Sequence, residues 1–65
     1  MAWKKTSWSG KRFRQWKNNH GDVINVENPP SGWEVHISTE RGDSGFKFKN
    51  QRQALIFANK LKKVI

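Results

Sequence analysis

The chain has 65 residues and no cysteine, and its 13 Lys and Arg exceed its 5 Asp and Glu, for a formal net charge of +8. This length allows one domain with a thin core, and the lack of cysteine excludes disulfides and thiolate metal sites. No apolar run approaches the roughly 18 residues of a membrane span, and no apolar stretch follows the basic start at residues 1–5 to make a secretory signal. We expect a cytoplasmic protein that is not an enzyme, because two His and five acids offer few ways to build a catalytic centre.

The charge is distributed unevenly along the chain. Residues 1–20 carry +6, residues 21–45 carry −4 and residues 46–65 carry +6. This segregation predicts two basic surfaces around a more acidic middle. A purely solubilising surface usually mixes both signs. The charge therefore favours a polyanionic partner over solubility alone.

Residues 1–17 are interpreted as a basic, tryptophan-containing arm, partly mobile. Its aromatic residues fit neither a helical nor a strand period: Trp3, Trp8, Phe13 and Trp16. We expect residues 1–10 to be mobile and their two tryptophans to be exposed. Residues 11–17 are predicted to add a short strand or turn that packs Phe13 or Trp16 onto the domain, and Trp16 is expected in the core.

The remaining residues, 18–65, are predicted to form a single β-β-β-α domain. The β-branched residues of Val23–Glu27 favour a strand. Apolar and polar residues alternate in Trp33–Ser38 and again in Phe46–Lys49, which predicts two further strands. The prolines of residues 28–32 end the first strand, and a glycine-containing loop joins the last two strands into an antiparallel hairpin.

A helix follows the strands. Asn50 is a suitable N-cap, and Gln53 stands three residues later in the capping-box position. One apolar stripe at helical spacing then runs to the end of the chain: Ala54, Phe57, Ala58, Leu61, Val64 and Ile65. Ile56 leaves this stripe and is expected to point away from the core.

These elements predict an α+β fold, with a three-stranded or four-stranded antiparallel sheet packed on one C-terminal helix. The predicted core combines one face of Val23–Val26 with Trp33, Val35, Ile37, Phe46, Phe48, Ala54, Phe57, Ala58 and Leu61. The opposite, open face of the sheet is then expected to show Asn25, Glu34, His36, Lys47 and Lys49.

Three stretches carry a resemblance: Gly-Trp-x-Val-x-Ile at residues 32–37, Phe-x-Phe-x-Asn at residues 46–50 and Ala-x-x-x-Ala-x-x-Leu at residues 54–61. Over residues 23–61 the chain resembles strand-strand-strand-helix DNA-binding modules. These include the arm-binding amino-terminal domain of tyrosine recombinases, the plant ethylene-response DNA-binding domain and small phage and bacterial proteins. The resemblance implies that the open face of the sheet enters the major groove of DNA. Glu34 on that face departs from the expected basic surface.

The first functional hypothesis is a nucleic-acid-binding module, with DNA preferred over RNA. Cations bind phosphates and aromatic rings stack on unpaired bases, so basic residues interleaved with aromatics favour this function. The candidate contacts come from the arm and the open face: Lys4, Lys5, Trp8, Lys11, Arg12, Arg14, Lys17, Asn25, His36, Lys47 and Lys49.

Two alternatives stay open. The exposed Ile56 and the surplus of tryptophan fit a small phage-type inhibitor or adaptor that docks on an acidic host protein. The arm could instead bind an anionic membrane surface. We expect no cofactor, no metal and no small-molecule substrate, because the spacing of His20 and His36 matches no ligand motif.

Overall fold

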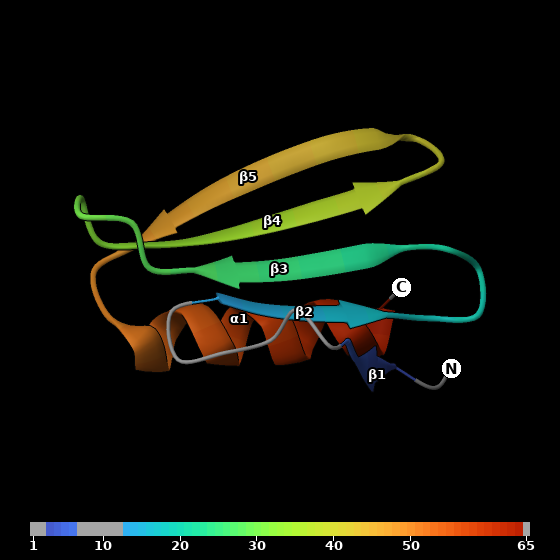
Figure 1. Ribbon diagram of the computed structural model, residues 1–65, viewed down its shortest axis with the longest axis horizontal. Coiled ribbons are helices and arrows are strands. Elements are labelled where there is room, and N and C mark those ends of the chain that lie inside the picture. The colour runs from blue at the N-terminus through green and yellow to red at the C-terminus, as the bar shows by residue number, and fades with distance from the viewer. Residues whose placement is uncertain (1–2, 7–12, 65) are drawn as a thin grey trace.

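The computed structural model describes residues 3–6 and 13–64. It is an α+β fold, an open antiparallel sheet of five strands in chain order followed by one helix (Figure 1). The elements are β1 (Lys4–Lys5), β2 (Phe13–Lys17), β3 (Val23–Glu27), β4 (Trp33–Thr39), β5 (Gly42–Phe48) and α1 (Gln51–Val64). The fold class is confirmed, and the sheet has five strands where three or four were predicted. No helix in the described part of the chain is long and apolar enough to cross a membrane.

The two additional strands come from residues 1–17. β2 pairs with β3 from Phe13 opposite Glu27 to Lys17 opposite Val23. A tight turn joins them, in which Oδ1 of Asn18 accepts hydrogen bonds from the backbone N–H groups of His20 and Asp22. β1 then pairs with the outer edge of β2. The short strand predicted within residues 11–17 is therefore present. Its aromatic and basic residues show no strand period in the sequence, yet the strand pairs with β3 in a regular register.

The last two strands are longer than predicted, because β5 begins at Gly42 rather than at Phe46. Only Glu40 and Arg41 separate β4 from β5, and Thr39 pairs directly with Gly42. Gly42 has a φ of 125°, which residues with side chains rarely adopt. The glycines near residue 42 suggested a loop, whereas they permit a tight hairpin with regular pairing.

The core lies between α1 and one face of the sheet, where α1 packs against β3, β4 and β5. Its buried side chains are Ile24, Val26, Val35, Ile37, Ala54 and Ala58, and partly buried residues around them include Trp16, Trp33, Phe48, Phe57 and Leu61. All of these were predicted core residues. The small side chains of Ala54 and Ala58 let the helix approach the strands closely. Asn50 caps the helix as predicted, because its Oδ1 accepts from the N–H of Gln53 at 2.9 Å.

Three predictions of burial are wrong. Phe46 lies on the helix side of the sheet but is 39% exposed, because β5 is an edge strand with no neighbour beyond it. Val64 is 78% exposed, so the buried stripe of α1 ends one turn earlier, at Leu61. Trp3 was expected to be exposed, whereas it is partly buried against the core. Ile56 is exposed, as expected, and Ile65 lies outside the described residues.

Candidate functional site

Strand register divides the predicted nucleic-acid contacts between the two faces of the sheet. Cross-strand partners share a face, so Lys5, which pairs with Trp16, and Arg14, which pairs with the buried Val26, lie on the helix side. The open face carries the other predicted contacts of the strands: Lys4, Lys17, Asn25, His36 and Lys47. Lys49 follows β5 and is exposed. Trp8, Lys11 and Arg12 lie outside the described residues.

The two basic segments of the chain meet at the β1–β2 end of the sheet. The indole Nε1 of Trp3 donates a hydrogen bond to the backbone carbonyl of Lys62 at 3.1 Å, which ties the start of the chain to the end of α1. The ammonium of Lys62 lies 3.7 Å from the centre of the Trp16 ring, within the range of a cation–π interaction. Burial and the nearby charge of Lys5 lower the pKa of Lys62 below its ordinary value.

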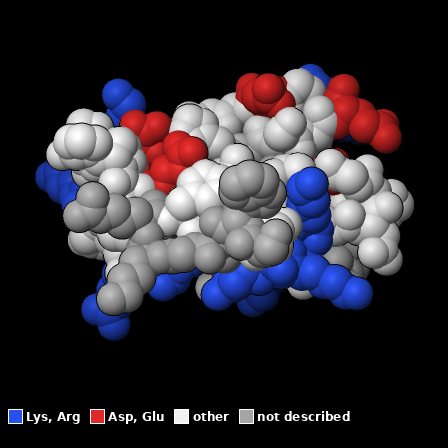
Figure 2. Space-filling model, in the orientation of Figure 1, with Lys and Arg blue, Asp and Glu red and all other residues white. Residues whose placement is uncertain are grey.

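We call this set of cations the basic edge: Lys4, Lys5, Arg14, Lys17 and Lys62. Lys4 stands opposite Lys17 in register, so two positive charges lie next to each other across the strands. Within residues 3–6 and 13–64 both ion pairs involve His36, and no Lys or Arg pairs with a carboxylate. Most of the blue atoms in Figure 2 lie along the lower part of the molecule, where Figure 1 places α1 and β1, and the red atoms lie above. No cation of the basic edge therefore forms an ion pair with an acid among the residues that the structure describes.

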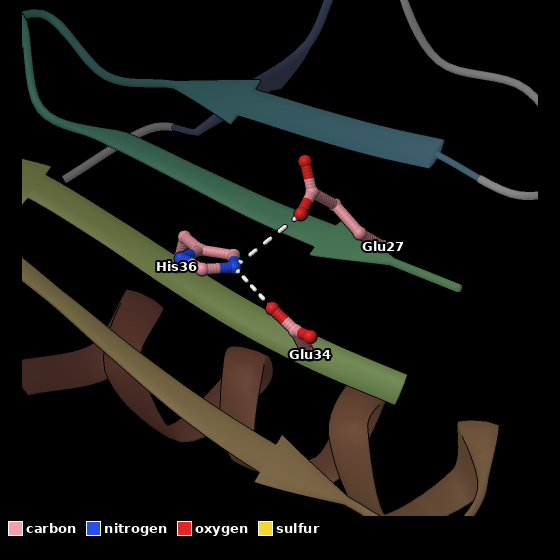
Figure 3. Close-up of side chains that lie close together, drawn as sticks. All are labelled: Glu27, Glu34 and His36. Atoms are coloured by element: carbon pink, nitrogen blue, oxygen red, sulfur yellow. Dashed lines mark hydrogen bonds and ion pairs between the residues drawn. The ribbon is translucent and has the colours of Figure 1, made fainter. Parts of the chain in front are cut away.

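The centre of the open face is acidic rather than basic. Nε2 of His36 lies 2.8 Å from Oε1 of Glu34 and 3.3 Å from Oε2 of Glu27. Figure 3 shows the imidazole of β4 between the two carboxylates, one from its own strand and one from β3. Alternation puts Glu34 and His36 on one face, and the β3–β4 register puts Glu27 opposite Glu34. We call Glu27, Glu34 and His36 the carboxylate–histidine cluster.

A shallow hollow of about 430 Å³ adjoins this cluster, lined among others by Asn25, Glu27, His36 and Gly45. A Cβ added at Gly45 would lie 3.0 Å from Nδ1 of His36, so the imidazole occupies space that a side chain there would fill. The Oδ1 atom of Asn25 is buried and accepts no hydrogen bond from the described residues.

His36 and Asn25 were predicted on the open face, but Glu27 was not expected beside them. The signal was present in the pattern Glu34-x-His36, since residues two apart in a strand share a face. Glu27 joins them only because the β3–β4 turn sets the register.

A second feature is an apolar groove beside β5. Phe48, Gln53, Ile56, Phe57 and Lys60 line it, and its volume is about 340 Å³. Ile56 is 51% exposed at its rim.

In comparisons with known proteins, no family model, no curated protein and no solved structure matches this chain. The resemblance to strand-strand-strand-helix DNA-binding modules therefore stays a prediction.

Proposed function

We propose that this protein is a non-enzymatic nucleic-acid-binding module that contacts the phosphates of DNA through the basic edge. The observation that carries the proposal is the absence, among the described residues, of any carboxylate paired with a Lys or Arg. The phosphates of DNA hold a condensed layer of small cations, and Lys or Arg side chains that neutralise these phosphates release those cations into solution. The net charge of +8 supports the same partner.

The position of the acids favours the basic edge over the open face as the contact surface. A phosphate placed at the centre of the open face would meet Glu27 and Glu34 beside His36. Lys47, the strand cation nearest to that centre, stands opposite Glu34 in register. At the basic edge, by contrast, Lys4 stands opposite Lys17, and Lys62 lies over the ring of the half-buried Trp16. The ring of Trp16 already packs against Lys62 and the core, so it supports the edge and leaves stacking on bases to other residues.

Binding titrations against labelled duplex DNA, single-stranded DNA and RNA at two salt concentrations test this function. We expect tight binding to duplex DNA that weakens steeply with salt. The double variant Lys5→Gln/Lys17→Gln should weaken binding and reduce the salt slope by about 1 for each phosphate that is no longer neutralised.

The matched control removes two cations at the other edge of the sheet, Lys47→Gln/Lys49→Gln. It should bind almost as wild type does. An equal loss in both double variants would show that charge alone, without the basic edge, attracts the nucleic acid. No binding to any of the three at low salt would overturn the proposed function itself.

A second candidate function, docking on an acidic protein, is favoured by the apolar groove. Ile56 at its rim shares the outward side of α1 with three cations, Arg52, Lys60 and Lys63. An exposed apolar side chain surrounded by cations can serve as an anchor in an apolar pocket of a partner protein whose surface around that pocket is acidic.

Ile56→Glu should then abolish binding to a defined acidic protein that the wild-type chain binds. Val64→Glu is the control, since Val64 is an exposed apolar residue at the end of the same helix. Nucleic-acid binding should survive both changes. Equal binding of the acidic protein by the Ile56 variant and wild type would refute this second candidate.

A further inference from the structure

We propose that the carboxylate–histidine cluster is a binding site for one divalent transition-metal ion, with zinc as the best match. This site lies on the open face of the sheet, away from the basic edge, and it is independent of the proposed nucleic-acid function. It follows from four features of the described residues: the distances between donor atoms, their charge, the way the strands hold them and an unpaired oxygen beside them.

The donor atoms are already close to the arrangement that a metal ion requires. One donor atom from each of Glu27, Glu34 and His36 lies within 4.8 Å of the others. A tetrahedral zinc with bonds of about 2.0–2.2 Å separates its ligand atoms by roughly 3.4 Å. The 3.3 Å between Nε2 of His36 and Glu27 meets this value, and the 2.8 Å to Glu34 needs a shift of about half an ångström.

The charge of the cluster also suits a dication. Two carboxylates lie side by side, and among residues 3–6 and 13–64 only His36 pairs with them. A metal ion takes the place of the proton on Nε2, so that neutral imidazole and two carboxylates together balance a charge of +2. His36 and Glu27 are 40% and 39% exposed at their side chains, so an ion reaches them from solvent.

The backbone holds the three side chains in place. Adjacent strands β3 and β4 supply all of them, and the pairing of Glu27 with Glu34 leaves no freedom of register. The imidazole lies over Gly45 of β5, where an added Cβ would come within 3.0 Å of Nδ1. The donors therefore sit on a rigid sheet, which lowers the ordering cost of forming the site.

A separate observation points to a further group at this place. The Oδ1 atom of Asn25 is buried without a hydrogen-bond donor among the described residues, and Asn25 lines the same hollow as Glu27 and His36. A buried acceptor without a donor is costly. A water molecule bound to the metal would complete four-coordination in a site with three protein ligands, and it is a strong donor on the side of the hollow that Asn25 lines.

The donor set selects the class of metal. One imidazole nitrogen with two carboxylates suits zinc and its neighbours among the divalent transition metals. Calcium and magnesium favour all-oxygen sites with six or more ligands. We therefore expect magnesium to compete poorly.

Isothermal titration of the full chain with zinc chloride, without nucleic acid, measures the site directly. We expect one zinc ion per chain, and we expect a cobalt-substituted sample to show the visible absorption of a tetrahedral centre. Loss of a supporting hydrogen bond alone costs roughly 10–100-fold in metal affinity. Glu27→Gln, Glu34→Gln and His36→Ala each remove a ligand and should weaken zinc binding by at least that factor.

The chain offers a matched control for each kind of change. His20→Ala removes the other histidine, which lies exposed in the β2–β3 turn, and Glu40→Gln removes an exposed acid of the β4–β5 turn. Both should bind zinc as wild type does. Circular dichroism checks folding, and the near-isosteric Gln variants keep the test valid if His36→Ala does not fold. Absence of zinc binding by wild type, or equal weakening by His20→Ala and His36→Ala, would overturn the proposal.

Discussion

Lys62 combines three roles in one residue. Its carbonyl accepts the hydrogen bond of Trp3, its ammonium lies over Trp16, and it belongs to the basic edge. The ring of Trp16 attracts the ammonium, while burial and the charge of Lys5 lower the pKa of Lys62. The folded state therefore holds this proton less tightly than the unfolded chain does, which makes the stability of the protein depend on pH.

The sign of this dependence gives a prediction. Because the pKa of Lys62 is lowered on folding, its charge opposes folding at neutral pH, and this penalty disappears as the pH rises toward the ordinary value of 10.5. Lys62→Met has no such proton. Its gain in unfolding free energy over wild type should therefore shrink as the pH rises from neutral toward 10.5.

Urea unfolding at several pH values, with Lys63→Met as the matched loss of one charge, measures this difference. The same pH trend in both variants would contradict the conclusion that the pH dependence of stability comes from Lys62.

Among the elements, β1 is the shortest and depends most on a partner outside the sheet. It has two residues, both exposed, and it pairs only with β2. The bond from Trp3 to Lys62 connects it to α1, and this carbonyl is one of the last four of the helix, which lack a partner within the helix. The indole N–H of Trp3 thus holds β1 against α1 and also satisfies a free carbonyl at the end of the helix.

Trp3→Phe keeps most of the apolar surface and removes this donor. We expect a loss of about 1 kcal/mol in the free energy of unfolding, the usual contribution of one hydrogen bond, and weaker binding to duplex DNA because Lys4 and Lys5 lose their support. Trp33→Phe is the comparison, since Trp33 also packs against the core but donates no hydrogen bond that the structure shows. Chemical denaturation followed by DNA titration measures both effects. Equal losses for the two variants would mean that packing alone, and not the hydrogen bond, holds β1.

At the scale of the whole molecule, cations and acids occupy different parts of the sequence, and the basic edge and the acids of the middle segment also lie in different parts of the fold. The two terminal segments, each with a charge of +6, were predicted to form two basic surfaces. Lys62 of the second segment joins cations of the first at the basic edge, because β1 and β2 lie beside the end of α1, whereas Lys47 and Lys49 lie at the opposite edge of the sheet. The acids of the middle segment lie on β3, β4, β5 and the turns beside them. One molecule therefore presents a cationic edge and a separate anionic cluster, and these two surfaces suit different ligands.

Local sequence determined much of the fold. The N-cap at Asn50, the apolar stripe from Ala54 to Leu61 and the alternation in Trp33–Ser38 all depend on neighbours along the chain, and the structure contains them. The strands β1 and β2 were harder to predict. The aromatic residues of this part of the chain follow no period. Only the pairing of β2 with β3, and of β1 with β2, makes these segments strands.

Tertiary structure alone decided the two candidate sites. Four of the five cations of the basic edge were predicted as contacts, all of them in the arm. Lys62 was not predicted, because its place beside Trp3 and Trp16 depends on how the end of α1 packs. The carboxylate–histidine cluster likewise needs Glu27 and Glu34 to come from different strands. Residue types and spacings determined the elements and the net charge. Which side chains share a surface was decided by strand pairing, since neither pairing nor register can be derived from local spacing.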